Sequence, residues 1–192
     1  STVAYVPTPA MLAGDFTAFA SPACNNGRQV TLGAPFVGNT VNPALFSPAA
    51  LNLVKRLPST TDPCGQITYS TKSDSDEAQY IGRIDYQRST NDAMFGRYMV
   101  TPINQPPAYA DSDNILTTPV PGLRDKAQSL TIGDSYVLSP NTVNSLRVAT
   151  NRAEVHRYNR DYFSAKDLGI NAYSYIPNQM VIAVNNAFNI GA

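Results

Sequence analysis

The stretch that decides the fold is Gln79-Tyr80-Ile81-Gly82-Arg83-Ile84-Asp85-Tyr86, whose side chains largely alternate in character. One side carries Tyr80, Gly82, Ile84 and Tyr86, and the other carries Gln79, Arg83, Asp85 and Gln87. A period of two is typical of a β-strand with one apolar-leaning face and one polar face. The chain is therefore predicted to build a sheet from this point onward.

The residues that follow predict two β-hairpins. The first turns at Ser89-Thr90-Asn91-Asp92, after which Met94, Gly96, Tyr98 and Val100 resume the apolar-leaning face. The second has Leu130, Ile132, Tyr136 and Leu138 before the turn Ser139-Pro140-Asn141, and Leu146, Val148 and Thr150 after it. Turn residues between alternating runs favour antiparallel pairing. Residues 101–126 and about 157–175 are predicted to be irregular.

Composition favours strands and loops over helices. The chain has 192 residues, of which only 15% are charged, with fifteen Pro, eleven Gly, two Glu and four Lys. Glu and Lys are common on helix surfaces, so helix should be scarce. We expect a mainly β protein whose antiparallel hairpins form a sandwich or a small or open barrel, with long loops. Two short helices are predicted, at residues 8–14 and 47–56, from Ser/Thr caps followed by Pro.

The expected organisation is a single β-rich domain over residues 1–192. Its first part, residues 1–75, reads as loop-rich, and residues 76–192 carry the hairpins and an uncharged C-terminal strand. The two cysteines, Cys24 and Cys64, lie in loop-like segments with no metal-ligand pattern beside them, which favours a disulfide over a metal site. A disulfide indicates an oxidising compartment, which is the periplasm, the cell surface or the outside of the cell.

Both ends of the chain are free of charge. No charged side chain occurs in residues 1–14 or in residues 168–192. Uncharged strands left open are templates for pairing with another chain, so these ends are predicted to pair with copies of the same protein. The predicted assembly strands comprise Thr2, Val3, Ala4, Tyr5 and Val6 at one end, and Met180, Val181, Ile182, Ala183, Val184 and Phe188 at the other.

Charge and motif content exclude several functional classes. The net charge is zero and the basic residues are dispersed, which excludes a nucleic-acid partner. The one histidine, His156, has no nucleophile motif or second ligand near it in the sequence, so no enzymatic activity is expected. No cofactor is expected either. Ca²⁺ is the one alternative, at Asp74-Ser75-Asp76-Glu77 or Asp111-Ser112-Asp113-Asn114, although neither has EF-hand spacing.

Four charged residues share the polar faces of the predicted strands, namely Arg83, Asp85, Arg97 and Arg147. Ion pairs across neighbouring strands are the ordinary interpretation. Contact with a ligand inside a barrel lumen is the alternative.

Several ordered segments resemble TonB-dependent outer-membrane receptors of the subset that begins with a carboxypeptidase-regulatory-like domain. The resembling segments are residues 6–16, 46–53, 79–86, 95–98, 138–148 and 151–152. The resemblance implies early barrel strands joined by long extracellular loops, with one face toward lipid and the other toward the lumen.

The chain also departs from that family. No plug domain or energy-coupling box is evident, and five to eight predicted strands fall short of the roughly 22 that close such a barrel. Ser1 follows neither Met nor a signal peptide, so we expect a processed product or a piece of a longer precursor.

Two hypotheses of function follow. The first is a non-enzymatic structural protein at the cell surface, derived from a receptor-like precursor, that assembles into filaments by strand pairing between copies. The second is a segment of an outer-membrane β-barrel that binds and imports a ligand.

Overall fold

The computed structural model describes residues 1–192, which form two compact units. The sheet unit comprises residues 73–106 and 122–158, and the loop-rich unit comprises residues 1–72, 107–121 and 159–192. The loop-rich segment expected at residues 1–75 is thus joined by two later segments of the chain. None of the helices is long and apolar enough to cross a membrane.

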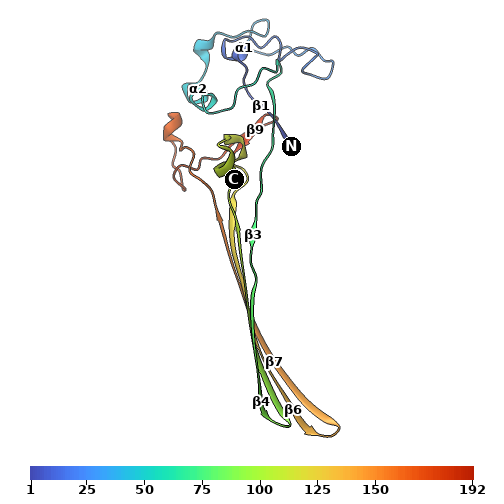
Figure 1. The fold of residues 1–192 in the computed structure, drawn as a ribbon. Coiled ribbons are helices and arrows are strands. Elements are labelled where there is room, and N and C mark those ends of the chain that lie inside the picture. Colours follow the sequence, from blue (N-terminus) through green and yellow to red (C-terminus); the bar gives the residue numbers. More distant parts are fainter. The chain divides into compact units, whose positions relative to one another are not determined.

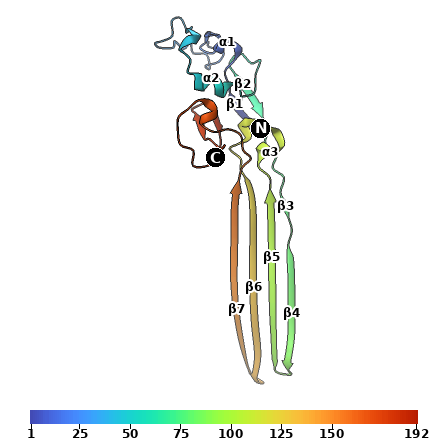
Figure 2. The same cartoon turned by 90° about the vertical axis from the view of Figure 1, so that its left-hand side faces the viewer.

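The sheet unit is one five-stranded antiparallel sheet (Figure 2). Its strands are β3 (Asp76–Glu77), β4 (Tyr80–Ser89), β5 (Asp92–Gln105), β6 (Gly122–Ser139) and β7 (Thr142–Tyr158). β3 and β4 both pair with one edge of β5, followed across the sheet by β6 and then β7. Both predicted hairpins are confirmed, with tight turns between β4 and β5 and between β6 and β7.

The connection between the two hairpins is shorter than predicted. Irregular structure was expected over residues 101–126, but β5 continues to Gln105 and β6 begins at Gly122. Most of the extra residues are polar, such as Arg124 opposite Asn104, and the isolated apolar residues Ile103 and Leu123 make no sustained alternation. Pairing with the neighbouring strand satisfies the backbone N–H and C=O groups of these residues. This contribution cannot be detected in the pattern of side chains.

The register of the sheet confirms the predicted faces. Directly opposed residues in an antiparallel pair lie on the same face. One row across four strands holds Ile84, Gly96, Ile132 and Val148, and the next row holds Asp85, Phe95, Gly133 and Arg147. The sheet therefore has an apolar face and a polar face, which we define by these two rows.

The loop-rich unit is built from short elements (Figure 1). Its strands are β1 (Thr2–Tyr5), β2 (Gln66–Tyr69), β8 (Ile182–Val184) and β9 (Phe188–Ile190). Its helices are α1 (Pro9–Leu12), α2 (Pro48–Val54) and α3 (Ala108–Ser112), with 3₁₀ turns η1 (Pro43–Leu45), η2 (Ile115–Thr117) and η3 (Lys166–Leu168).

The two predicted helices form, with different caps. Thr8 caps α1 by accepting a hydrogen bond from the backbone of Met11, as Ser/Thr caps do. Gly14 follows α1 at φ +89°, and a Cβ there would lie 2.0 Å from the carbonyl oxygen of Val41. Only glycine fits that position. Ser47 precedes α2 but makes no side-chain capping hydrogen bond. The start of α2 is therefore favoured by Pro48 at its first helical position.

Both terminal segments are paired inside the chain. β1 pairs antiparallel with β2, from Thr2 opposite Tyr69 to Tyr5 opposite Gln66. The expected single strand over residues 179–188 is a hairpin, in which β8 and β9 pair with each other. Asn186 takes φ +59° in its turn, a conformation that asparagine tolerates better than most residues. Each terminal segment thus has one backbone partner within the chain, and pairing between copies stays a prediction.

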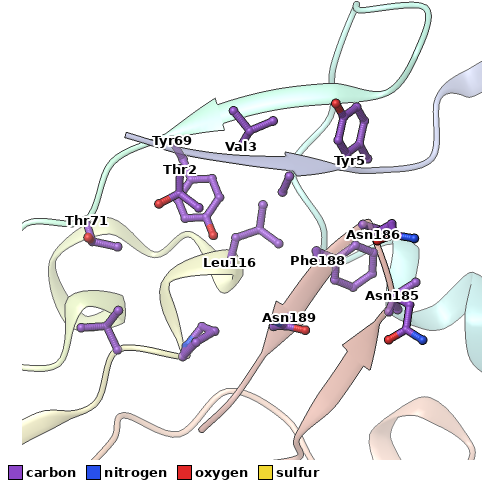
Figure 3. Close-up of a pocket in the computed structure, with 15 residues that line it drawn as sticks. Thr2, Val3, Tyr5, Tyr69, Thr71, Leu116, Asn185, Asn186, Phe188 and Asn189 are labelled. Atoms are coloured by element: carbon purple, nitrogen blue, oxygen red, sulfur yellow. The ribbon is translucent and has the colours of Figure 1, made fainter. Parts of the chain in front are cut away.

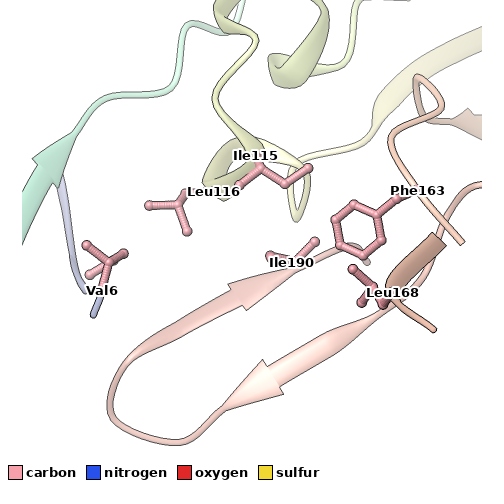
Figure 4. Close-up of a cluster of buried hydrophobic side chains, with 7 residues drawn as sticks. Val6, Ile115, Leu116, Phe163, Leu168 and Ile190 are labelled. Atoms are coloured by element: carbon pink, nitrogen blue, oxygen red, sulfur yellow. The ribbon is translucent and has the colours of Figure 1, made fainter. Parts of the chain in front are cut away.

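Buried side chains from distant segments form the core of the loop-rich unit (Figure 4). The cluster comprises Ala4, Val6, Ile115, Leu116, Phe163, Leu168 and Ile190. Thr118, fully buried, adds polar bonds to it: its hydroxyl accepts from the backbone nitrogen of Gly191 at 2.8 Å, and its carbonyl accepts from Asn159 at 2.8 Å. The three separate segments of this unit are therefore held by one core.

The predicted disulfide joins Cys24 to Cys64, with Cα atoms 5.3 Å apart. Both residues lie in turns of the loop-rich unit. The bond closes a loop over a sequence separation of 40 residues. In the chain-entropy model, closing such a loop lowers the conformational entropy of the unfolded chain and so stabilises the folded state by about 4 kcal/mol.

Replacing a core residue should destabilise the loop-rich unit. We expect Leu116→Ala to lower the free energy of unfolding by roughly 2 to 5 kcal/mol, because Leu116 is 1% exposed and its removal leaves a cavity. Leu45→Ala, at a side chain that is 64% exposed, is the matched control and should change it by less than about 0.5 kcal/mol. Urea denaturation followed by tyrosine near-ultraviolet circular dichroism measures both. Equal effects of the two substitutions would contradict the proposed core.

Candidate functional site

The polar face of the sheet brings the four predicted charged residues together. Arg83 on β4 lies directly opposite Arg97 on β5, and the adjacent row on the same face pairs Asp85 with Phe95. Arg147 on β7 belongs to that second row, opposite Gly133 of β6. We call Arg83, Asp85, Phe95, Arg97 and Arg147 the guanidinium cluster.

Arg83 is held by two partners within the cluster. Its guanidinium donates to the carboxylate of Asp85 at 2.7 Å, two residues along the same strand. It also stacks over the ring of Phe95, 4.3 Å from the ring centroid. Both partners restrict the side chain, because a guanidinium favours carboxylates and aromatic faces alike. The ordinary interpretation expected ion pairs across neighbouring strands. The ion pair of Arg83 with Asp85 is instead made along one strand.

Phe95 is fixed in turn by a glycine. A Cβ placed on Gly133 would lie 2.1 Å from the Cε1 atom of Phe95, so the ring lies directly over the backbone of β6. Glycine inside a strand often marks such a close approach. Neither Phe95 nor Gly133 stood out as a site residue in the sequence, although a glycine at the centre of an alternating strand was the available signal.

Two arginines of the cluster have no partner. Arg97 and Arg147 make no hydrogen bond and no ion pair with any other residue of the chain. They line a hollow of about 270 Å³ together with Arg83, Phe95 and Thr131. The hollow therefore presents free guanidinium groups, which bind oxyanions and repel cations.

The loop-rich unit has a separate pocket of about 630 Å³ (Figure 3). Its wall comes from β1, β2, η2, and the β8–β9 hairpin, and includes Tyr5, Tyr69 and Phe188. The backbone nitrogen of Tyr5 donates to the carbonyl of Ala187 at 3.0 Å, which ties β1 to the hairpin turn. No charged side chain lines the pocket.

Polar groups without partners face this pocket. Asn185, Asn186 and Asn189 line it, and none of their side-chain amides makes a hydrogen bond within the chain. Burial raises the pKa of Tyr69, so its phenol stays neutral at physiological pH. Neutral donors and acceptors beside aromatic rings suit a neutral polar ligand.

The predicted assembly strands supply much of this pocket's lining. Thr2, Val3, Ala4 and Tyr5 come from β1, and Val184 and Phe188 come from the hairpin. Val6 lies in the core, Ile182 and Met180 pack against that core, and Val181 is 60% exposed. The uncharged residues at the two ends of the chain thus supply part of the core and part of the pocket lining within one molecule.

The remaining candidates are scattered. His156 lies on β7, opposite Arg124, with its ring stacked on Tyr158 at 6.4 Å between centroids. Asp113 pairs with Arg160 at 2.5 Å, which engages one of the two acidic segments considered for Ca²⁺. No three His, Cys, Asp or Glu side chains gather at metal-binding distances.

Comparison with known proteins gives one match. A family model described as an outer membrane beta barrel domain matches residues 1–191. No curated protein and no solved structure matches the chain.

A branched side chain at Gly133 should disturb the guanidinium cluster. We expect Gly133→Val to lower the free energy of unfolding by about 1 to 3 kcal/mol, because the side chain must displace the ring of Phe95. Gly96→Val is the matched control, since a Cβ at Gly96 meets nothing within 4 Å. Thermal unfolding followed by far-ultraviolet circular dichroism compares them. An unaltered midpoint for Gly133→Val would contradict the close approach.

Proposed function

The chain belongs to the outer-membrane β-barrel domain family, and on that premise we propose that it forms part of the wall of a TonB-dependent-receptor-like import protein. In this proposal the sheet unit crosses the outer membrane, and the loop-rich unit lies at the cell surface and contacts the ligand. The protein has no enzymatic role. Family membership supports a location at the bacterial outer membrane or cell surface.

The observation that carries the proposal is the uncovered apolar face. Ile84 is 75% exposed, Val148 is 62% exposed and Ile132 is 51% exposed, although all three lie in one row of the sheet. No second layer within the sheet unit packs on them. A soluble protein rarely leaves so continuous an apolar surface in water, whereas a barrel wall presents one to lipid.

The extent of the apolar face suits a bilayer. Its rows run along β5 from Val100 to Asp92, roughly 27 Å of strand at about 3.4 Å per residue. Tyr80 lies at one border of this band and Tyr136 at the other, as interfacial aromatic residues do in outer-membrane barrels. Asp134 is a charged residue near the Tyr136 border, one row from Asp92.

The connections of the sheet support a direction across the membrane. Tight turns join β4 to β5 and β6 to β7 at one end, whereas at the other end every connection leads into the loop-rich unit. Outer-membrane barrels have short periplasmic turns and long extracellular loops. The proposal therefore assigns the tight turns to the periplasm and the loop-rich unit to the cell surface.

The import role is supported by the polar face and by the order of the resembling segments. In a barrel, the face opposite the lipid lines the lumen, and here it carries the guanidinium cluster. The uncharged pocket of the loop-rich unit is a second place where a ligand could be held before import.

A filament subunit is the second candidate. β4 pairs only with β5 and β7 pairs only with β6, so the sheet has two open edges. Open edges in a barrel are closed by further strands, and between copies they would pair into a filament. The terminal strands on which this hypothesis first rested are paired within the chain, so β4 and β7 take their place.

A cation on the apolar face should oppose membrane insertion. We expect Ile132→Arg to weaken folding into lipid vesicles by about 2 to 4 kcal/mol, the cost of arginine facing lipid at midplane. Ser129→Arg, three residues away on the polar face of the same strand and opposite Met99 and Asn151, is the matched control and should cost much less. Urea titration of folding into vesicles of defined thickness measures both.

Two results would contradict the membrane proposal. One is an equal loss for Ile132→Arg and Ser129→Arg. The other is recovery of the protein from plain buffer as long fibres in negative-stain micrographs, which would favour the filament instead. Recovery only in detergent supports the barrel.

A further inference from the structure

We propose that the hollow between Arg97 and Arg147 is a binding subsite for an oxyanion group, carboxylate or phosphate, carried by a small solute. The inference concerns the polar face of the sheet unit alone. It rests on the proposed function only in assigning that face to the lumen, where a passing solute would meet it.

The free charge of the cluster is the first argument. Three guanidinium groups and one carboxylate, that of Asp85, occupy neighbouring rows on one face. Asp85 is engaged by Arg83 at 2.7 Å, which leaves Arg97 and Arg147 without an acceptor. Like charges on neighbouring strands repel each other, so an anion between them would stabilise the arrangement.

The spacing of the two arginines is the second argument. Arg97 on β5 and Arg147 on β7 are separated by the whole of β6 and by one same-face row. From strand spacing and rise, their Cα atoms lie roughly 12 Å apart. Two arginine side chains can converge over that distance on one small group.

The floor of the hollow is the third argument. Between the two arginines, β6 presents Thr131 and Gly133 to the polar face, and neither has a long side chain. The hydroxyl of Thr131 makes no hydrogen bond within the chain and so is a further donor. Thr131 forms the open part of this floor, and Gly133 makes room for the ring of Phe95 at its edge.

The aromatic wall is the fourth argument. Phe95 lies over Gly133 and carries Arg83 on its face at 4.3 Å, so one side of the hollow is ordered before any ligand arrives. An ordered site loses less conformational entropy on binding than a mobile one. Guanidinium groups also bind planar or tetrahedral oxyanions through paired N–H donors, which chloride cannot match.

The experiment uses the full chain in detergent micelles, with inorganic phosphate titrated by ³¹P NMR. We expect saturable binding that acetate displaces and chloride, at equal ionic strength, does not. Arg97→Gln and Arg147→Gln should each weaken phosphate binding about tenfold or more, because a hydrogen bond to a charged group is worth that much. Arg152→Gln, on the opposite face, is the matched control and should leave binding unchanged.

Arg97→Lys provides a second test should a glutamine variant fail to fold. It keeps the charge and loses the paired donors, so it should bind phosphate more weakly than the unaltered chain and still bind it. The relative strength of phosphate and acetate tells which oxyanion the site favours.

Three results would overturn the inference: no saturable phosphate binding, equal competition by chloride, or equal weakening by Arg152→Gln. These results are independent of membrane insertion, which the Ile132 and Ser129 variants measure separately. Failure of the subsite and failure of the barrel proposal are therefore distinguishable.

Discussion

An apolar sheet face without a covering layer is the constraint on which the rest of this protein depends. Ile84, Ile132 and Val148 stand in one row with most of their surface exposed. Water disfavours that surface, and the sheet unit has no helix to bury it. Contact with lipid would remove that penalty, and membership of the outer-membrane β-barrel domain family agrees with such an environment. The long strands, the tight turns at one end and the border tyrosines are all consistent with that environment.

The polar face of the same sheet carries the charged residues of the guanidinium cluster. Neighbouring rows on this face hold three arginines and one aspartate. Asp85 and Phe95 hold Arg83, while Gly133 lets the aromatic ring approach the backbone of β6. The guanidinium of Arg83 thus has partners within the chain, whereas those of Arg97 and Arg147 have none. Alternation along the strand separates the apolar face, proposed to meet lipid, from the polar face, proposed to meet a ligand.

The loop-rich unit is organised by contacts between segments far apart in the chain. Leu116 and Thr118, from the connection between the two hairpins, pack or bond with residues of both chain ends. The disulfide closes the long N-terminal loop in the same unit. The uncharged ends meet there and line a neutral pocket, so their lack of charge has a role within one molecule.

The sequence alone determined the hairpins, their turns, their two faces, the short helices and the disulfide, because each depends on neighbouring residues or on cysteine context. It also indicated that Arg83, Asp85, Arg97 and Arg147 share a face, since period two is a local property. Only the tertiary structure decided the pairing of β1 with β2, the terminal hairpin, the extended ends of β5 and β6, and the Phe95–Gly133 contact. The terminal hairpin is local, but the other features depend on backbone hydrogen bonds and close approaches between residues far apart in the sequence. Side-chain alternation carries no record of that pairing.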